Sequence, residues 1–179
     1  MGYYSDVSIA ITESQYYRFR ISYISSLQKE IADDVLRILN SADILLKTDE
    51  NVVLLSWECI KWNIGDPIIR IIEKELLTSK EEDDFYEFLY IGEEDQDIYH
   101  TFGGKSQGKT YFYVIRQIEK AIEDPRKIVS LNSKKPIDYF KYNETDIKVQ
   151  TYINNMYSLL KSYKQYKMKL EDNWSYVYE

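Results

Sequence analysis

The spacing of the apolar residues changes at Thr12, and this change constrains the fold more than any other feature of the sequence. Before it, Val7, Ile9 and Ile11 alternate with small or polar residues, the period of two that is typical of a half-buried strand. After it, apolar residues recur at steps of three and four, which predicts an amphipathic helix over residues 13–40. The chain therefore begins as a strand that leads into a helix.

The following segments continue this alternation of strand and helix patterns. Residues 42–63 hold two apolar runs around a turn-prone segment, which predicts a β-hairpin whose second strand is apolar on both faces and therefore central. Asp66 and Pro67 then mark the start of a shorter second helix. Further strands of an antiparallel meander are predicted from aromatic and β-branched residues in 85–94, 97–104 and 109–119.

This order predicts an α+β domain over residues 1–124, with the sequence βαββαββ. Its simplest packing is a largely antiparallel sheet of about five or six strands with two helices on one face. Residues 125–179 form a basic, Tyr-rich C-terminal segment, in which the apolar spacing predicts a helical extension over about 144–170.

The chain of 179 residues contains one cysteine, Cys59, and one histidine, His100. This excludes an internal disulfide and a Cys/His zinc site, and we expect neither a metal nor a cofactor. Cys59 falls in the predicted central strand and is expected to be a buried, inert thiol. No apolar run approaches the roughly 18 residues of a membrane span and no secretory signal is evident, so we expect no membrane association and a cytoplasmic location.

The net charge of −7 is unevenly distributed. Residues 1–124 carry 24 acids against 13 bases, and residues 81–97 carry nine acids and no base. Residues 125–170 carry ten Lys or Arg against three acids. The sequence thus predicts two surfaces of opposite charge, either of which is a candidate binding surface.

The acidic segment has three interpretations. In the first, it forms solvated loops that only maintain solubility. In the second, it forms a surface whose carboxylates take the place of nucleic-acid phosphates in a basic groove of another protein. In the third, it forms a divalent-metal site, which is disfavoured because no complete calcium-loop spacing is present. The candidate partner-binding residues are Glu81, Glu82, Asp83, Asp84, Glu93, Glu94, Asp95 and Asp97.

The basic segment interleaves lysine with tyrosine. Lysine neutralises phosphates and tyrosine rings stack on unpaired bases, so this composition suits a surface that binds single-stranded or structured RNA. The alternative is that the tyrosines form a core stripe and the lysines only solvate the outer face. The candidate RNA-binding residues are Lys134, Lys135, Lys141, Lys148, Lys161, Lys164, Lys167, Tyr142 and Tyr163.

No complete catalytic motif is present, but one stretch holds the residue types of a metal-independent ribonuclease. His100 is a candidate base for a 2′-hydroxyl, and Lys105 and Lys109 are candidate cations for the phosphate. The alternative is that His100 is a structural strand residue. The glycine-rich stretch 103–109 is predicted to be a mobile hairpin loop, since it does not open a helix.

Three short motifs carry a resemblance to known proteins: GYYSDV at residues 2–7, WECIKW at 57–62 and IGE at 91–93. Over residues 1–100 the chain resembles small proteins of phages and mobile elements of Gram-positive bacteria. Within that setting it is similar in size and organisation to anti-CRISPR proteins that inhibit type II RNA-guided nucleases.

The resemblance implies a phage or prophage protein that acts in the host cytosol on a type II CRISPR nuclease and its guide RNA. Three functions stay open: a binding inhibitor with guide RNA truncation, a purely steric inhibitor without RNA cleavage, and a phage accessory protein unrelated to CRISPR. If the chain is an enzyme, the resemblance implies a ribonuclease acting on the guide. The tyrosine-rich stripe of the C-terminal segment is also compatible with a homodimer.

Overall fold

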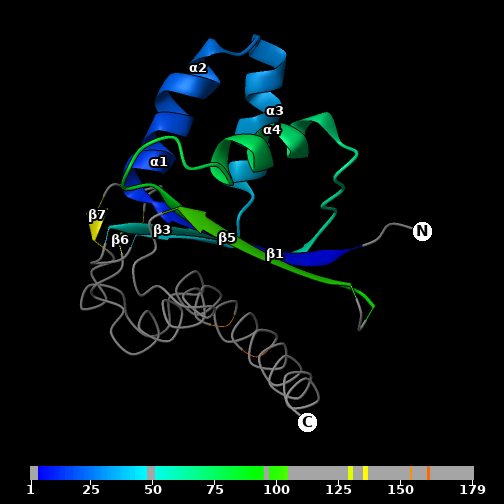
Figure 1. The fold of residues 1–179 in the computed structure, drawn as a ribbon. Helices are drawn as coiled ribbons and strands as arrows, with labels where there is room; N and C mark the ends of the chain where they lie inside the picture. Colours follow the sequence, from blue (N-terminus) through cyan, green and yellow to red (C-terminus); the bar gives the residue numbers. More distant parts are fainter. Residues whose placement is uncertain are drawn as a thin grey trace.

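The described strands form one antiparallel sheet with helices on one face (Figure 1). The computed structural model describes residues 4–47, 51–94 and 97–104, the short pieces 129–130 and 135–136, and the single positions 154 and 161. The predicted α+β class and the antiparallel sheet with helices on one face are confirmed. The predicted strand in 109–119 lies outside the described residues.

The sheet has the strand order β5-β4-β1-β3-β2-β6-β7, with β1 between β3 and β4. All six pairings between the described strands are antiparallel. β3 is buried on both faces over its first six residues, as expected for a strand between two others. The strands are β1 (Ser5–Thr12), β2 (Ile44–Lys47), β3 (Val52–Ile60), β4 (Phe85–Gly92), β5 (Ile98–Gly104), β6 (Val129–Ser130) and β7 (Lys135–Pro136).

The predicted single helix over 13–40 is wrong, because the helix is interrupted at Leu27 and Gln28. Both residues have extended backbone, with ψ of 159° and 142°. The hydroxyls of Ser25 and Ser26 donate to carbonyls of the preceding turn, an alternative to helix continuation. The elements are α1 (Glu13–Tyr17), a π-helix (Arg18–Tyr23), α2 (Ile24–Ser26) and α3 (Lys29–Asn40).

The second predicted helix is α4 (Pro67–Leu76), and its start follows the sequence signal. The Asp66 carboxylate accepts from the backbone N–H of Ile68 at 2.7 Å, which satisfies a donor at the open helix end, and Pro67 occupies the first turn. In the described part of the chain, no helix is long and apolar enough to cross a membrane.

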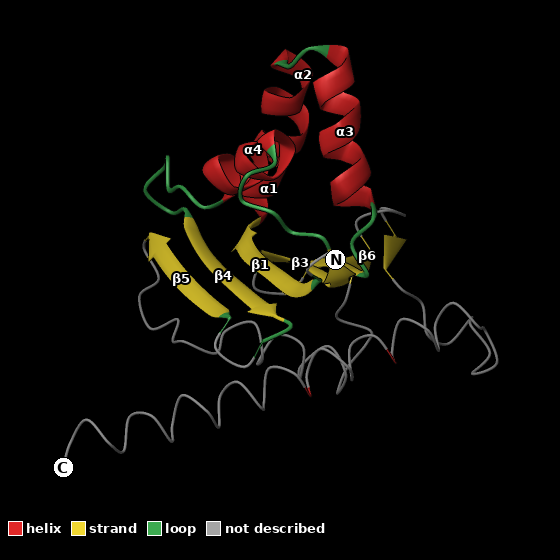
Figure 2. Ribbon diagram, turned by 90° about the vertical axis from the view of Figure 1, so that its right-hand side faces the viewer, coloured by secondary structure: helices red, strands yellow, loops and turns green. Residues whose placement is uncertain are grey.

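The core lies between the sheet and the helices (Figure 2). The Trp57 indole of β3 donates to the carbonyl of Ile38 in α3, which joins the sheet to the helical layer. Within that layer, the Gln15 amide of α1 donates to the carbonyl of Leu76 at the end of α4. The cluster of buried apolar residues is Val7, Ile9, Ile11, Tyr16, Phe19, Ile24, Val35, Leu39, Leu45, Val53, Leu55, Trp57, Trp62, Ile69, Ile72, Leu76 and Phe88.

The sheet face away from the helices also carries buried side chains. By the strand register, Ser8 of β1 pairs with Ser56 of β3, and their hydroxyls lie 2.5 Å apart. On the same face, Glu87 of β4 is buried beside His100 of β5. The predicted burial of the second hairpin strand, β3, on both faces is confirmed over its first six residues.

Candidate functional site: an acidic sheet end and an aromatic groove

The acidic segment of the sequence is divided by the fold into two separate groups. Strand β4 runs from Phe85 to Gly92, so Glu81–Asp84 precede it and Glu93 and Glu94 follow it. Eight strand residues at about 3.3 Å each place the two groups about 26 Å apart. One run in the sequence is thus two groups of carboxylates at opposite ends of the sheet.

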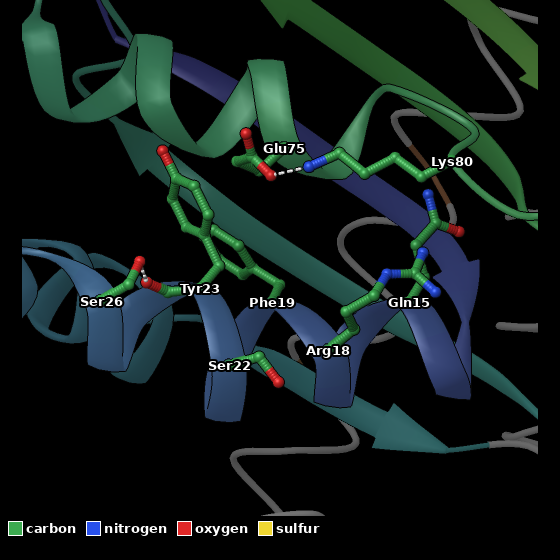
Figure 3. A pocket seen from close by; sticks show the side chains of 8 residues that line it. All are labelled: Gln15, Arg18, Phe19, Ser22, Tyr23, Ser26, Glu75 and Lys80. Atoms are coloured by element: carbon green, nitrogen blue, oxygen red, sulfur yellow. Dashed lines mark hydrogen bonds and ion pairs between the residues drawn. The ribbon is translucent and has the colours of Figure 1, made fainter.

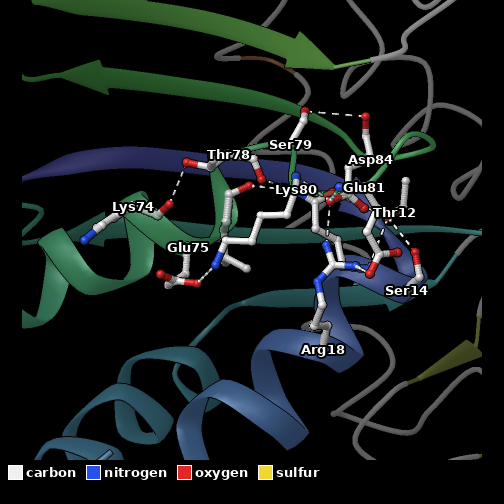
Figure 4. A network of polar contacts seen from close by, with 12 residues as sticks. Thr12, Ser14, Arg18, Lys74, Glu75, Thr78, Ser79, Lys80, Glu81 and Asp84 are labelled. Atoms are coloured by element: carbon white, nitrogen blue, oxygen red, sulfur yellow. Dashed lines mark hydrogen bonds and ion pairs between the residues drawn. The ribbon is translucent and has the colours of Figure 1, made fainter. Parts of the chain in front are cut away.

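The first group is partly neutralised by one cation of the fold, Arg18 (Figure 4). Arg18 of the π-helix pairs with Glu81 at 2.7 Å and with Asp84 at 2.5 Å. Asp84 is only 1% exposed, and its Oδ2 also accepts from the backbone N–H of Lys80 and of Glu81. Asp84 is therefore a structural residue, and its expected role in contacting a partner is wrong. Glu81, Glu82 and Asp83 are exposed.

A small pocket of about 310 Å³ lies between the first helical run and the end of α4 (Figure 3). Its two cations already have partners, because Arg18 pairs with Glu81 and Asp84 and Lys80 pairs with Glu75. The pocket therefore offers no unneutralised charge to a ligand. The lining residues are Gln15, Arg18, Phe19, Ser22, Tyr23, Ser26, Glu75 and Lys80.

The second group joins acids from other strands at the end of the sheet where β1 starts and β4 ends. The register places Ser5 opposite Gly92 there, and the backbone N–H of Tyr4 donates to Glu93 at 3.2 Å. We call this surface the acidic sheet end. Its described carboxylates are Asp6, Asp43, Glu58, Glu93, Glu94 and Asp97.

A β-bulge near the end of β3 draws two of these carboxylates together. The register shifts between Ser5 and Val7, and Cys59 has a positive φ of 51°. The freed backbone N–H groups donate to acids: that of Cys59 to Asp6 at 3.0 Å and that of Glu58 to Asp43 at 2.7 Å. The bulge thus orients the carboxylates of Asp6 and Asp43 at the acidic sheet end.

The bulge also places Cys59 on the surface, so its predicted burial in the central strand is wrong. Its thiol pKa is raised, first by desolvation and then by the negative charges of Asp6, Glu58, Asp43 and Glu93. A raised pKa lowers the thiolate fraction at neutral pH, which makes the thiol a weak nucleophile. The inertness of this thiol stays a prediction, which the raised pKa supports through desolvation first and the neighbouring acids second.

The ion pairs of Arg18, Arg37, Lys47, Lys80 and His100 lie away from the acidic sheet end. Lys61 lies nearby, with its ammonium 5.4 Å from the centre of the Tyr4 ring. This end of the fold therefore presents a concentrated negative charge that can attract a basic partner.

An aromatic groove of about 1080 Å³ adjoins this end on the helix side of the sheet. Residues 61–64 and α4 form one wall, and β4 and β5 form the other. The rings of Trp57, Trp62, Phe88 and Tyr99 follow one another with centres 5.2, 6.2 and 6.0 Å apart. Tyr99, the outermost, is 57% exposed, so this row leads from the core to the surface.

His100 does not have the exposure that a ribonuclease base requires. Its side chain is 7% exposed, and its Nε2 lies 2.9 Å from the Glu87 carboxylate on the buried sheet face. A base must reach the substrate hydroxyl within hydrogen-bond distance, and this position does not offer that access. Lys105 and Lys109 lie outside the described residues.

The candidate RNA-binding residues fall mostly outside the described part of the chain. Lys135 belongs to strand β7, and Lys161 is an exposed helical position. Asp95 of the acidic segment is likewise outside. The opposed basic surface predicted from the sequence therefore stays a prediction.

Comparison with protein-family models, with curated proteins and with solved structures gave no match. Within the described ranges, no group of three or more His, Cys, Asp or Glu side chains is arranged to hold a metal ion.

Sequence reasoning missed Asp6, Asp43 and Glu58 because they belong to three separate chain segments. The signal that could have found them is the antiparallel pairing of β1 with β3 and of β2 with β3, which brings strand starts and strand ends together.

Proposed function

We propose that this chain is an anti-CRISPR inhibitor that binds a type II RNA-guided nuclease loaded with its guide RNA. The observation that carries the proposal is the acidic sheet end, where six carboxylates from separate strands and turns gather at one end of the sheet. Such nucleases hold guide and target in positively charged channels, and complementary charge favours docking there. The GYYSDV, WECIKW and IGE motifs support the same class.

Binding without RNA cleavage is the favoured mechanism. The burial of His100 beside Glu87 argues against an accessible catalytic base at this position. The excess of Lys and Arg in residues 125–170 supports a contact with exposed guide RNA, because cations neutralise phosphates. In this proposal the acidic sheet end contacts the protein and the basic segment contacts the guide.

The test is one incubation of the chain with type II nucleases, each loaded with an end-labelled guide, followed by readout of guide length and target cleavage. We expect loss of cleavage near equimolar inhibitor, with the guide intact. Glu93→Gln with Glu94→Gln weakens inhibition about tenfold if the acidic sheet end docks, by analogy with close interfacial charges. The matched control, Glu30→Gln with Asp33→Asn, removes two exposed charges from α3 and leaves inhibition unchanged.

Two outcomes would overturn this proposal. A shortened guide identifies guide truncation as the mechanism, and its persistence in a His100→Gln variant then assigns the chemistry to other residues. Normal target cleavage with every type II nuclease in the panel removes the CRISPR assignment and leaves an accessory binding protein.

A further inference from the structure

The aromatic groove combines an exposed ring with carboxylates at its mouth. Tyr99 and Tyr90 line it from β5 and β4, and Asp97 and Glu73 contribute the acids. The Tyr90 hydroxyl donates to Asp97 Oδ2 at 3.3 Å, and the Trp62 indole donates to Glu73 Oε1 at 2.8 Å. Both carboxylates are thus held at defined places on the groove wall.

Asp97 is further fixed by its contact with Gly92. A Cβ on Gly92 would lie 2.1 Å from Asp97 Oδ2, so a larger residue there would force the Asp97 side chain to shift from this position. The backbone N–H of Gly92 also donates to the carbonyl of Asp97 at 2.7 Å, closing the β4–β5 connection. This packing presets the carboxylate before any ligand arrives.

Neither Asp97 nor Glu73 forms an ion pair with a Lys or Arg of the described chain. Lys61 is the cation among the lining residues, and its ammonium lies 5.4 Å from the centre of the Tyr4 ring. An aromatic face beside an unneutralised carboxylate is the arrangement that a guanidinium recognises, by stacking on the ring and by charged hydrogen bonds to the acid. The same carboxylates repel phosphate, which disfavours a nucleic-acid strand. The volume of about 1080 Å³ also exceeds the space that one side chain fills and leaves room for the flanking residues.

We propose that this groove binds an arginine side chain presented by an extended segment of a partner protein, with the guanidinium stacked on Tyr99 and paired with Asp97. The inference defines the chemistry of the contact and goes beyond the proposed inhibition, since it holds for any partner with such a segment. For a basic nuclease, it would add a specific anchor beside the general attraction of the acidic sheet end.

The test uses the full chain and a short fluorescein-labelled peptide in which glycine and arginine alternate, measured by fluorescence anisotropy at about 0.15 M salt. The control peptide carries citrulline, which keeps the shape and hydrogen-bonding plane of arginine without its charge. We expect the arginine peptide to bind about tenfold more tightly, and Tyr99→Leu and Asp97→Asn each to weaken it by about threefold to tenfold. Binding should also shift the NMR resonance of the Trp62 indole N–H, which lies at the groove wall.

Matched variants at other surfaces control for nonspecific loss. Tyr17→Leu removes an exposed ring on α1 and Asp34→Asn removes an exposed charge on α3, and neither should change the affinity. Urea unfolding of each variant verifies that the fold is retained. Should Asp97→Asn prove unstable, Tyr99→Leu and the citrulline peptide still decide the question, because Tyr99 is largely exposed.

Three results would overturn the inference. Equal binding of arginine and citrulline peptides removes the charge recognition. Loss of binding in Glu93→Gln with Glu94→Gln, with no loss in Tyr99→Leu, assigns the peptide to the acidic sheet end instead. A single-stranded RNA that binds with the same dependence on Tyr99, while the peptide does not bind, replaces the protein partner with RNA.

Failure of the arginine-binding proposal leaves the nuclease assay of the proposed function unaffected, because that assay reads inhibition directly.

Discussion

Arg18 and Asp84 are 66 residues apart in the sequence, yet their side chains meet at 2.5 Å. Asp84 is buried and Arg18 is 28% exposed, so the pair lies at the boundary of the interior. It joins the π-helix to the segment that enters β4, and the same carboxylate oxygen holds two backbone N–H groups. The contact therefore fixes both the first helical run and the start of a sheet strand.

Asp84→Ala should lower the free energy of unfolding by about 3 kcal/mol, because it leaves the Arg18 guanidinium and two backbone donors without their acceptor. Urea unfolding followed by tryptophan fluorescence measures this. Asp34→Ala removes an exposed i,i+3 pair with Arg37 and should cost less than about 0.5 kcal/mol. Equal losses in the two variants would refute the structural role of Asp84.

Gly104→Ala should destabilise the fold by at least about 1 kcal/mol. Gly104 has a φ of +84°, and an added Cβ would lie 2.1 Å from the backbone carbonyl oxygen of Asp84. Gly65→Ala is the matched control, since its Cβ would meet only the Asn63 side chain, at 3.1 Å. Thermal unfolding should therefore show a clear loss for Gly104→Ala and little change for Gly65→Ala.

Phe88→Ala should cost about 3–5 kcal/mol, as expected for truncating a buried aromatic residue. Phe88 is 3% exposed and lies between the rings of Trp62 and Tyr99, whereas Phe102 is 47% exposed. Phe102→Ala is thus the control, with a much smaller expected cost. The prediction fails if chemical denaturation gives the two variants the same midpoint.

Cys59 should react slowly with iodoacetamide at neutral pH although it is exposed. Desolvation and then the acids around it raise its pKa, so the thiolate becomes abundant only at higher pH than in the unfolded chain. The alkylation rate plotted against pH should rise at higher pH in the folded protein than in urea. Asp6→Asn should move the folded profile toward lower pH, and an unchanged profile would contradict the electrostatic explanation.

Local sequence patterns were sufficient for the strands β1 to β5 and for α4, and for their order along the chain. The alternation of Val7, Ile9 and Ile11 predicted β1, and Asp66 with Pro67 predicted the start of α4, because strand period and helix capping depend on neighbours along the chain. The interruption at Leu27 and Gln28 was missed. Two adjacent serines were the available signal, but the helical spacing of the apolar residues continued across them.

The charge surface was decided by the tertiary structure. Glu81–Asp84 and Glu93–Asp97 read as one acidic run, yet Arg18 pairs with Glu81 and Asp84 of the first group, while Asp6, Asp43 and Glu58 reinforce the second. The sequence determined how many charges the chain carries and which segments become strands and helices. Only the fold determined which charges cancel, because electrostatic energy depends on the distance between groups in space and on their burial.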